Sequence, residues 1–310
     1  MRALASPASF KGVLTAAEAA AALAEGLRTG GAEAVELPVA DGGEGTAETL
    51  WLALGGDWRE AGVHDAFGAP RQARWLLLPD GTAVVEAAAA VPLDPGRLDP
   101  LAASSRGFGE LVAAALAHGA RSLVLGLGGT ATMDAGAGFL EVVGELPART
   151  RVACDVTATL LEAPRLFGPQ KGAGAEVVLE LERRFADRGD FGALREARFG
   201  GAAGGLGAAL ASLGAELVAG APLVLDAIRF DATGFDLVVT GEGRVDATTA
   251  LGKAPGEVVR RSGSTPCVVV GGVVAAEVPG AAATVALSGD PAKAREDLVA
   301  AGRELASGRR

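Results

Sequence analysis

The feature that most constrains the fold is a repeated order of local patterns: a short apolar run, a glycine-rich polar loop, and a segment of helix-forming composition. This order recurs after residues 2–6, 35–39 and 121–127. Short β-branched runs bounded by turn residues are typical of buried parallel strands. Strands that alternate with helices predict an α/β fold, whose ligands bind beyond the carboxyl ends of the strands.

The charged segment 240–255, TGEGRVDATTALGKAP, directly follows the apolar run 235–239. It places a Glu, an Arg, an Asp and a Lys between glycines. Charges just past the end of a buried strand lie where open α/β sheets bind ligands. A solvated loop is the alternative interpretation of one such segment. The recurrence of similar loops along the chain favours a ligand site.

Two similar loops stand near the amino terminus. Residues 7–12, PASFKG, separate the first predicted strand from a helix over 15–28, for which Thr15 and Glu18 form a capping-box signature. Residues 40–46, ADGGEGT, follow the next predicted strand and precede another helix. Glycines there allow the backbone to approach a ligand, and the free amides at the start of the following helix favour an anion.

The middle of the chain carries a third loop of this kind, GGTATMDAGAG at 128–138, ahead of a predicted helix over 138–143. This order of strand, loop and helix suits phosphate binding. Its spacing, however, matches neither the Walker nor the dinucleotide pattern. A further predicted strand, 151–156, contains Asp155 near its end.

Runs 75–78 and 83–87 flank a Pro-Asp-Gly turn, which predicts a β-hairpin and therefore a mixed sheet. Two more glycine-rich segments follow, FGPQKG at 167–172 and GAAGGLGAA at 201–209, the second opening an alanine-rich helix. Close helix packing is the alternative to phosphate binding for the second segment.

Lysine is rare in this chain and concentrated in these loops. Only Lys11, Lys171, Lys253 and Lys293 occur among 28 basic residues, and the first three stand next to a glycine. A lysine ammonium binds phosphate as a compact point charge, unlike the fork of an arginine. The distribution therefore supports phosphate binding.

Composition restricts the class of protein. The 310 residues are 49% hydrophobic and 21% charged, as in a globular chain, and this length favours two domains. A formal net charge of −10 argues against nucleic acid or a membrane as a partner. Cys154 and Cys267 lie far apart in apolar runs, so we expect free core thiols. The sequence shows no signal-peptide pattern, which predicts a cytoplasmic location.

A set of motifs, taken in order, resembles the bacterial glycerate kinases of the two-domain type. They are SFKG, ADGGEGT, GGTATMDAGAG, ACDV, FGPQKGA, GAAGGLGAAL, and TGEGRVD with GKAP. The resemblance runs from residue 1 to about 270. It implies that the chain uses ATP and Mg²⁺ to phosphorylate D-glycerate, giving 2-phosphoglycerate in preference to 3-phosphoglycerate. The expected assembly is a monomer or homodimer.

The same resemblance implies an architecture of two α/β domains. A Rossmann-like three-layer domain would be built from both chain ends, residues 1–60 plus 226–310. A second α/β domain, residues 61–225, would be inserted between them. The active site would lie in the cleft between the domains.

Residues in the matching motifs carry the implied site roles. The catalytic set is Asp246, Asp155, Lys11, Arg244 and Lys253, in which Asp155 and Asp246 are also the candidate metal ligands. The substrate-binding set is Ser9, Asp41, Gly42, Gly43 and Glu44. The nucleotide-binding set is Gly128, Gly129, Thr130, Asp134, Lys171, Gly204 and Gly205. Phosphoryl transfer requires a metal and cations on the phosphates, with one carboxylate as metal ligand and the other as base. Turn formation, helix capping and solvated ion pairs are the alternative roles.

Three positions depart from the family pattern. The family usually has Asp where this chain has Ala8, and Asn where it has Met133 and Ala158. The loss of these polar groups leaves two alternatives open: a divergent kinase for a related hydroxy acid, or a non-catalytic nucleotide- or metabolite-binding relative. A dehydrogenase is disfavoured, because no GxGxxG follows the first strand.

Overall fold

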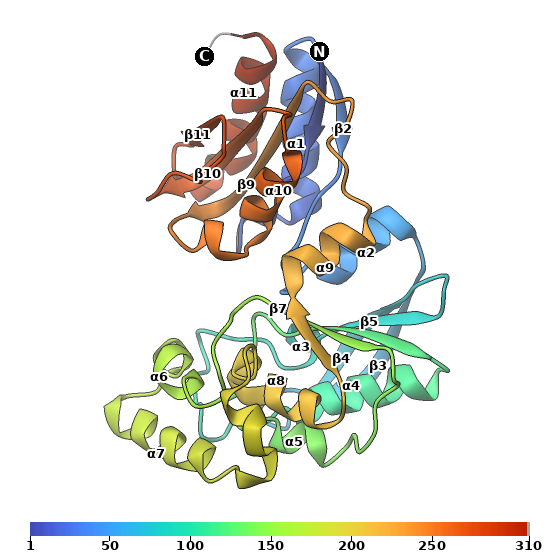
Figure 1. Cartoon of the computed structure of the whole chain (residues 1–310), viewed down its shortest axis with the longest axis vertical. Coiled ribbons are helices and arrows are strands. Elements are labelled where there is room, and N and C mark those ends of the chain that lie inside the picture. The colour runs from blue at the N-terminus through green and yellow to red at the C-terminus, as the bar shows by residue number, and fades with distance from the viewer. Residues whose placement is uncertain (309–310) are drawn as a thin grey trace. The chain divides into compact units, whose positions relative to one another are not determined.

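The computed structural model describes residues 1–308 and contains two compact α/β units (Figure 1). The terminal unit comprises Met1–Asp41, Glu48–Ala53 and the chain from Ala221 onward. The central unit comprises Gly42–Ala47 and Leu54–Gly220. The domain boundaries expected at residues 60 and 226 stay predictions.

The terminal unit is built on a five-stranded sheet in the order β11-β10-β9-β1-β2. Every neighbouring pair in it is parallel. The strands are β1 (Arg2–Ala5), β2 (Glu33–Glu36), β9 (Leu237–Val245), β10 (Cys267–Val274) and β11 (Ala283–Ala286). Most residues of the central strands β10, β9 and β1 are apolar and buried, as expected when helices cover both faces of a sheet.

Helices cover the two faces of this sheet and make three layers. Helices α1 (Ala16–Thr29) and α11 (Ala294–Ala306) share one hydrophobic core with Val239 and Val270. On the opposite face, the side chain of Cys267 forms a hydrogen bond with the side chain of Ser262 of α10 (Ala254–Ser262). Successive residues of a strand point to opposite faces of the sheet, so one strand packs against the helices on both faces. The expected three-layer, Rossmann-like arrangement is confirmed.

The start of α1 is confirmed in detail. Thr15 Oγ1 accepts the Glu18 amide at 3.2 Å, and the Glu18 carboxylate accepts the Thr15 amide at 2.8 Å. The capping box satisfies two backbone donors that the helix leaves unpaired.

Strand β9 is longer than the sequence indicated. The strand expected over 235–239 begins at Leu237 and continues to Val245, so the first six residues of the charged segment are strand and not loop. Pairing explains the difference: Thr240 to Val245 lie opposite Val269 to Val274 of β10. A neighbouring strand supplies hydrogen bonds that a local pattern does not reveal.

The central unit has a six-stranded mixed sheet in the order β3-β4-β5-β6-β7-β8. The strands are β3 (Asp57–His64), β4 (Pro70–Leu77), β5 (Thr82–Glu86), β6 (Ser122–Gly126), β7 (Thr150–Cys154) and β8 (Glu216–Ala219). The pairs β3–β4 and β4–β5 are antiparallel and the others are parallel, which confirms the hairpin and the mixed sheet. Strand β3 was not predicted, because half of its residues are polar and, at the sheet edge, only Val63 of the strand is buried.

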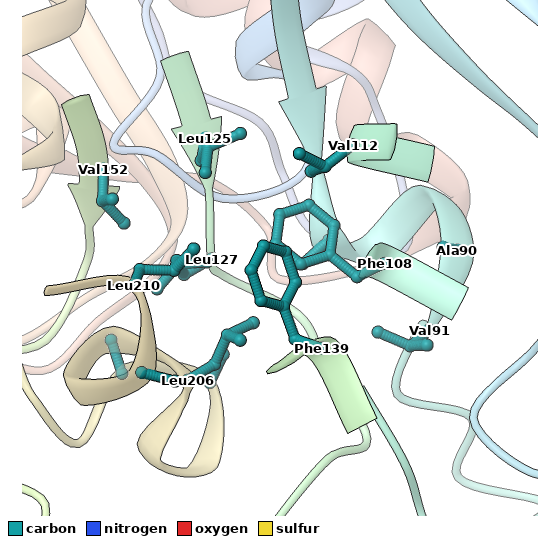
Figure 2. Packing of buried hydrophobic residues seen from close by; sticks show 14 of the residues in the cluster. Ala90, Val91, Phe108, Val112, Leu125, Leu127, Phe139, Val152, Leu206 and Leu210 are labelled. Atoms are coloured by element: carbon teal, nitrogen blue, oxygen red, sulfur yellow. The ribbon is translucent and has the colours of Figure 1, made fainter. Parts of the chain in front are cut away.

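The helices of the central unit surround one hydrophobic core. They are α3 (Ala87–Ala90), α4 (Arg106–Ala117), α5 (Ala137–Leu140), α6 (Ala163–Phe167), α7 (Ala175–Ala186) and α8 (Ala202–Ser212), with short 3-10 turns at Pro169–Lys171 and Gly189–Glu196. Figure 2 shows Phe108 of α4 beside Phe139 of α5, with their ring centroids 5.5 Å apart. Leu125 of β6 and Leu206 of α8 point toward the same core (Figure 2).

Two helices begin in the central unit and continue into the terminal unit: α2 (Thr46–Leu54) and α9 (Gly220–Ala227). The terminal unit also contains short 3-10 turns at Thr249–Leu251 and Pro291–Lys293. Within residues 1–308, no helix is long and apolar enough to span a membrane. Cys154 and Cys267 are buried free thiols, as expected.

Candidate functional site

A cavity of about 360 Å³ opens at the carboxyl edge of the sheet in the terminal unit. It is lined by residues that follow or end β1, β9, β10 and β11 and by the start of α11. Its polar lining includes Ser9, Lys11, Asp41, Glu242, Arg244 and Lys253. Five of these are residues that the sequence analysis selected.

The topology explains why these side chains meet. The chain passes from β1 through α1 to β2 in one direction along the sheet, and from β9 through α10 to β10 in the other. The adjacent strands β1 and β9 therefore form a switch point, where the connections leave toward opposite faces. Open α/β sheets bind ligands at this position.

A hydrogen-bond network fixes the acidic side chains of β9 and the turn after it. The Thr249 hydroxyl is fully buried, accepts the Asp246 amide at 3.0 Å and donates to Glu242 Oε1 at 2.7 Å. Lys253 Nζ lies 3.4 Å from Glu242 Oε2 and 3.9 Å from Asp246 Oδ1. Arg244 Nε lies 3.5 Å from Asp246 Oδ2. The predicted catalytic residues of this segment thus form one linked group.

The two carboxylates of the network differ in their electrostatics. Burial raises the pKa of Glu242, the charge of Asp41 adds to the rise, and Thr249 and Lys253 oppose it. In contrast, hydrogen bonds from Thr248 hold the pKa of Asp246 below its usual value. Glu242 therefore binds a proton more readily than Asp246 does.

Glu242 was not among the residues selected from the sequence. The signal was present, because Glu242 belongs to the TGEGR motif. Its position inside β9 was not expected, and that position directs its half-buried side chain to the cavity wall.

The central unit holds a smaller cavity of about 80 Å³ at the carboxyl edge of its own sheet. Gly128, Gly129 and Thr130 line it, together with Asp155 and Lys171. The structure thus joins five predicted catalytic or nucleotide-binding residues from three separate motifs.

Lys171 is buried in the wall of this second cavity. Its Nζ donates to the Thr132 carbonyl oxygen at 2.8 Å. Burial lowers the pKa of Lys171 to about 8, and the charges of Asp155 and Asp134 oppose this shift. A buried cation beside a glycine loop is suited to an anionic group.

The ADGGEGT motif is divided between the units after Asp41. In the central unit, Gly42 accepts the Gly128 amide at 3.4 Å, and a Cβ atom on Gly128 would lie 2.6 Å from Gly43 Cα. Close backbone packing therefore explains these glycines. Glu44, the remaining predicted substrate residue, is exposed in the same loop.

Glu86, at the end of β5, anchors this loop and was also missed. Its carboxylate accepts the Ala47 amide at 3.0 Å, and the Thr46 and Gly45 amides favour its charged form. Burial nevertheless raises the pKa of Glu86 to about 7. A single glutamate after an apolar run carries no local signal of this role.

Three predicted nucleotide-binding residues lie outside the cavity lining in the described chain. Asp134 accepts the Ser105 amide and hydroxyl, each at 2.8 Å, and so connects its loop to the start of α4. Gly204 has φ +67°, and a Cβ atom there would lie 1.9 Å from the Thr132 carbonyl oxygen. Gly205 is likewise tightly packed, with Leu160 Cδ1 2.5 Å from a Cβ position. Their contacts support packing roles.

The expected metal site depends on the oxygen donors that the chain offers. Among residues 1–308, no cluster of three or more His, Cys, Asp or Glu side chains is placed to hold a metal ion. Asp155 and Asp246 belong to different units. Each offers carboxylate oxygens, which suit Mg²⁺, an ion that commonly takes only one or two carboxylates and completes its shell with phosphate and water.

The fold and the two cavities define the class. The chain is an α/β protein with a cation-lined cavity at a sheet switch point and a second cavity with a glycine loop and a buried lysine. This combination is suited to small anionic ligands.

The chain belongs to the glycerate kinase family, whose model matches residues 3–147 and 145–307. A glycerate kinase of Bacillus subtilis is 38% identical over 323 residues, covering 87% of this chain and 84% of that protein. A glycerate 2-kinase of Escherichia coli is 37% identical, covering 82% and 80%. The crystal structure of a protein described as glycerate kinase 2 from Salmonella typhimurium matches with a TM-score of 0.81 and 31% identity, over 100% of this chain and 98% of that one.

The family match extends beyond residue 270, where the motif resemblance ended, to residue 307. The three departures lie in buried positions: Met133 joins the central core, and Ala8 and Ala158 are less than a tenth exposed. Ala8 donates its amide to the Gly241 carbonyl oxygen at 2.8 Å, which attaches the SFKG loop to β9.

Proposed function

We propose that this chain transfers the γ-phosphoryl group of ATP to D-glycerate and gives 2-phosphoglycerate. The observation that carries the proposal is the terminal-unit cavity, where Lys11, Arg244 and Lys253 accompany a half-buried Glu242. Cations suit the carboxylate of an acid and the transferring phosphate, and a carboxylate suits the acceptor hydroxyl. Relatives described as glycerate kinase and glycerate 2-kinase support this assignment.

Each unit contributes a separate task in this proposal. In the terminal unit, Lys11, Arg244 and Lys253 neutralise negative charge. In the central unit, the Gly128–Thr130 loop and Lys171 contact nucleotide phosphates. Bound Mg²⁺, held through Asp155 or Asp246, would neutralise charge on the phosphates. Buried free thiols are compatible with a cytoplasmic location, and a monomer or homodimer remains our expectation.

Glu242 is the residue that we assign as the proton acceptor for the glycerate hydroxyl. It lines the cavity and its pKa is raised by burial, whereas Asp246 is held by Thr248 at 2.5 Å outside the cavity lining. A base is most effective when its pKa approaches the working pH. Asp246 then has the role of orienting Arg244 and Lys253.

An assay of ADP release over a panel of hydroxy acids tests the function. We expect D-glycerate to give the highest kcat/KM. Direct consumption of the product by enolase, without a mutase, would identify 2-phosphoglycerate. Stronger stimulation by another acid would favour the divergent kinase, and ATP binding without turnover on any acid would favour a non-catalytic relative.

The variants Glu242→Gln and Asp246→Asn test the assignment of the base. Removal of a general base costs about 10²- to 10⁴-fold. We expect E242Q to lose kcat in that range with a small change in KM, and D246N to raise KM for glycerate instead. An undiminished kcat in E242Q, or the larger kcat loss in D246N, would contradict the assignment.

A further inference from the structure

The cavity of the terminal unit is larger than its proposed acid substrate requires. Cavities of roughly 300 to 1,000 Å³ hold drug-sized ligands, and this one measures about 360 Å³. A three-carbon acid is much smaller than such ligands. A second chemical group therefore fits in the same cavity.

The cavity has two chemically different ends. At the switch point between β1 and β9 the lining is charged, because Lys11, Arg244 and Lys253 lie there with Asp41 and Glu242. The other end lies along β10, β11 and the start of α11, where apolar side chains line it. These are Val273, Leu287, Pro291 and Ala294.

The two ends are continuous. Val273 of β10 pairs in register with Arg244 of β9 and is 45% exposed, unlike the buried apolar residues earlier in β10. Leu287 follows β11 and donates its amide to the Gly271 carbonyl oxygen at 2.8 Å. An exposed apolar side chain in a concave wall offers a planar or apolar group a surface to cover.

Two carboxylates border the apolar end. Asp297 accepts the Ser288 amide at 3.0 Å and the Ser288 hydroxyl at 2.5 Å, which fixes the loop after β11. Asp290 accepts the Ala292 amide at 3.0 Å. Both line the cavity. Unlike Asp41 and Glu242, these two carboxylates have no lysine or arginine beside them in the cavity lining that residues 1–308 form. They therefore suit hydroxyl groups, such as the ribose hydroxyls bound in Rossmann-type sheets, better than phosphates.

We propose that the apolar end of the terminal-unit cavity binds the nucleoside of the phosphoryl donor. The purine lies against Val273, Leu287 and Pro291, the ribose hydroxyls face Asp290 or Asp297, and the phosphates extend toward Lys11, Arg244 and Lys253. The inference rests on the proposed use of ATP. It assigns a nucleoside site that the glycine loops of the central unit did not indicate.

Photoaffinity labelling with 8-azido-ATP tests the site without turnover. Trypsin releases residues 262–293, which carry most of the apolar end, and residues 122–149, which carry the GGTAT loop. We expect the label on 262–293 and its displacement by ADP. Label confined to 122–149 would overturn the proposal, and so would displacement by D-glycerate but not by ADP.

The variant Val273→Trp fills the apolar end, and Val35→Trp is its control. Val35 lies on β2 of the same unit outside the cavity lining and is 36% exposed. We expect V273W to lose the 262–293 label and to weaken ADP binding at least tenfold in calorimetry, while V35W behaves as the wild type. Retained label and ADP affinity in V273W would overturn the proposal. A protein that labels as expected but phosphorylates no acid would refute the proposed function alone.

Discussion

Thr249 connects the turn after β9 to the acidic wall of the cavity. Its hydroxyl is fully buried between the Asp246 amide at 3.0 Å and Glu242 Oε1 at 2.7 Å. Replacement by valine keeps the shape of the side chain and removes both hydrogen bonds. Replacement by serine keeps the hydroxyl and removes one methyl group.

The magnitude follows from the type of each bond. A hydrogen bond to a charged group contributes about 1.5–3 kcal/mol and a neutral one about 0.5–1.5 kcal/mol. Glu242 faces the cavity, where water replaces part of the loss. We therefore expect Thr249→Val to lower the free energy of unfolding by about 2–4 kcal/mol. Thr249→Ser should cost only about 1 kcal/mol for the buried methyl.

The same change alters the titration of Glu242. The Thr249 bond favours the charged carboxylate and opposes the rise of its pKa. Without that bond the pKa of Glu242 rises further, so the acidic limb of kcat/KM should move to higher pH in T249V and stay in place in T249S. Urea unfolding followed by circular dichroism and a pH–rate profile measure the two effects. Equal stabilities and equal acidic limbs in the two variants would refute the network.

Three further predictions concern the central unit. The pKa of Glu86 is about 7 in the folded protein against an ordinary 4.5, so between these pH values the folded protein keeps a proton that the unfolded chain releases. The free energy of unfolding therefore falls by about 3 kcal/mol as the pH rises through this range. Glu86→Gln should abolish this fall in urea titrations at pH 5 and 8. The pKa of Lys171 is about 8 in the folded protein against an ordinary 10.5, so the free energy of unfolding should rise as the pH rises from 8 to 10.5. Lys171→Met should remove that rise. The same variant should weaken ADP binding in calorimetry. Gly204→Ala would place a Cβ atom against the Thr132 carbonyl oxygen at a residue with positive φ, and should lower the free energy of unfolding by about 2–5 kcal/mol. The ADP affinity of the folded protein should stay unchanged. Weaker ADP binding at unchanged stability would instead support a role of Gly204 in phosphate binding.

Local chemistry made much of the fold predictable. The Thr15 capping box, the hairpin between β4 and β5 and the buried parallel strands each depend on neighbours in sequence. The same local order of strand, loop and helix located both cavities, because parallel strands bring their carboxyl ends to one edge.

Pairing and burial were not predictable in the same way. Strand β9 continues through the charged segment because β10 lies beside it, and that pairing places Glu242 in the cavity wall. Glu86 and Lys171 acquire shifted pKa values from burial, which depends on segments distant in sequence. No spacing of residue types reports such burial.

The glycine-rich motifs show why one local signal has two physical meanings. A glycine permits close approach to its backbone, but the partner can be a ligand or another part of the chain. Gly129 lines a cavity, whereas Gly128 also packs against Gly43, and Gly204 packs against Thr132. The identity of the partner depends on which loops the sheet brings together. A glycine motif therefore locates a crowded edge of the sheet, and the charged side chains at that edge, such as Lys171 and Glu242, distinguish a binding site from tight packing.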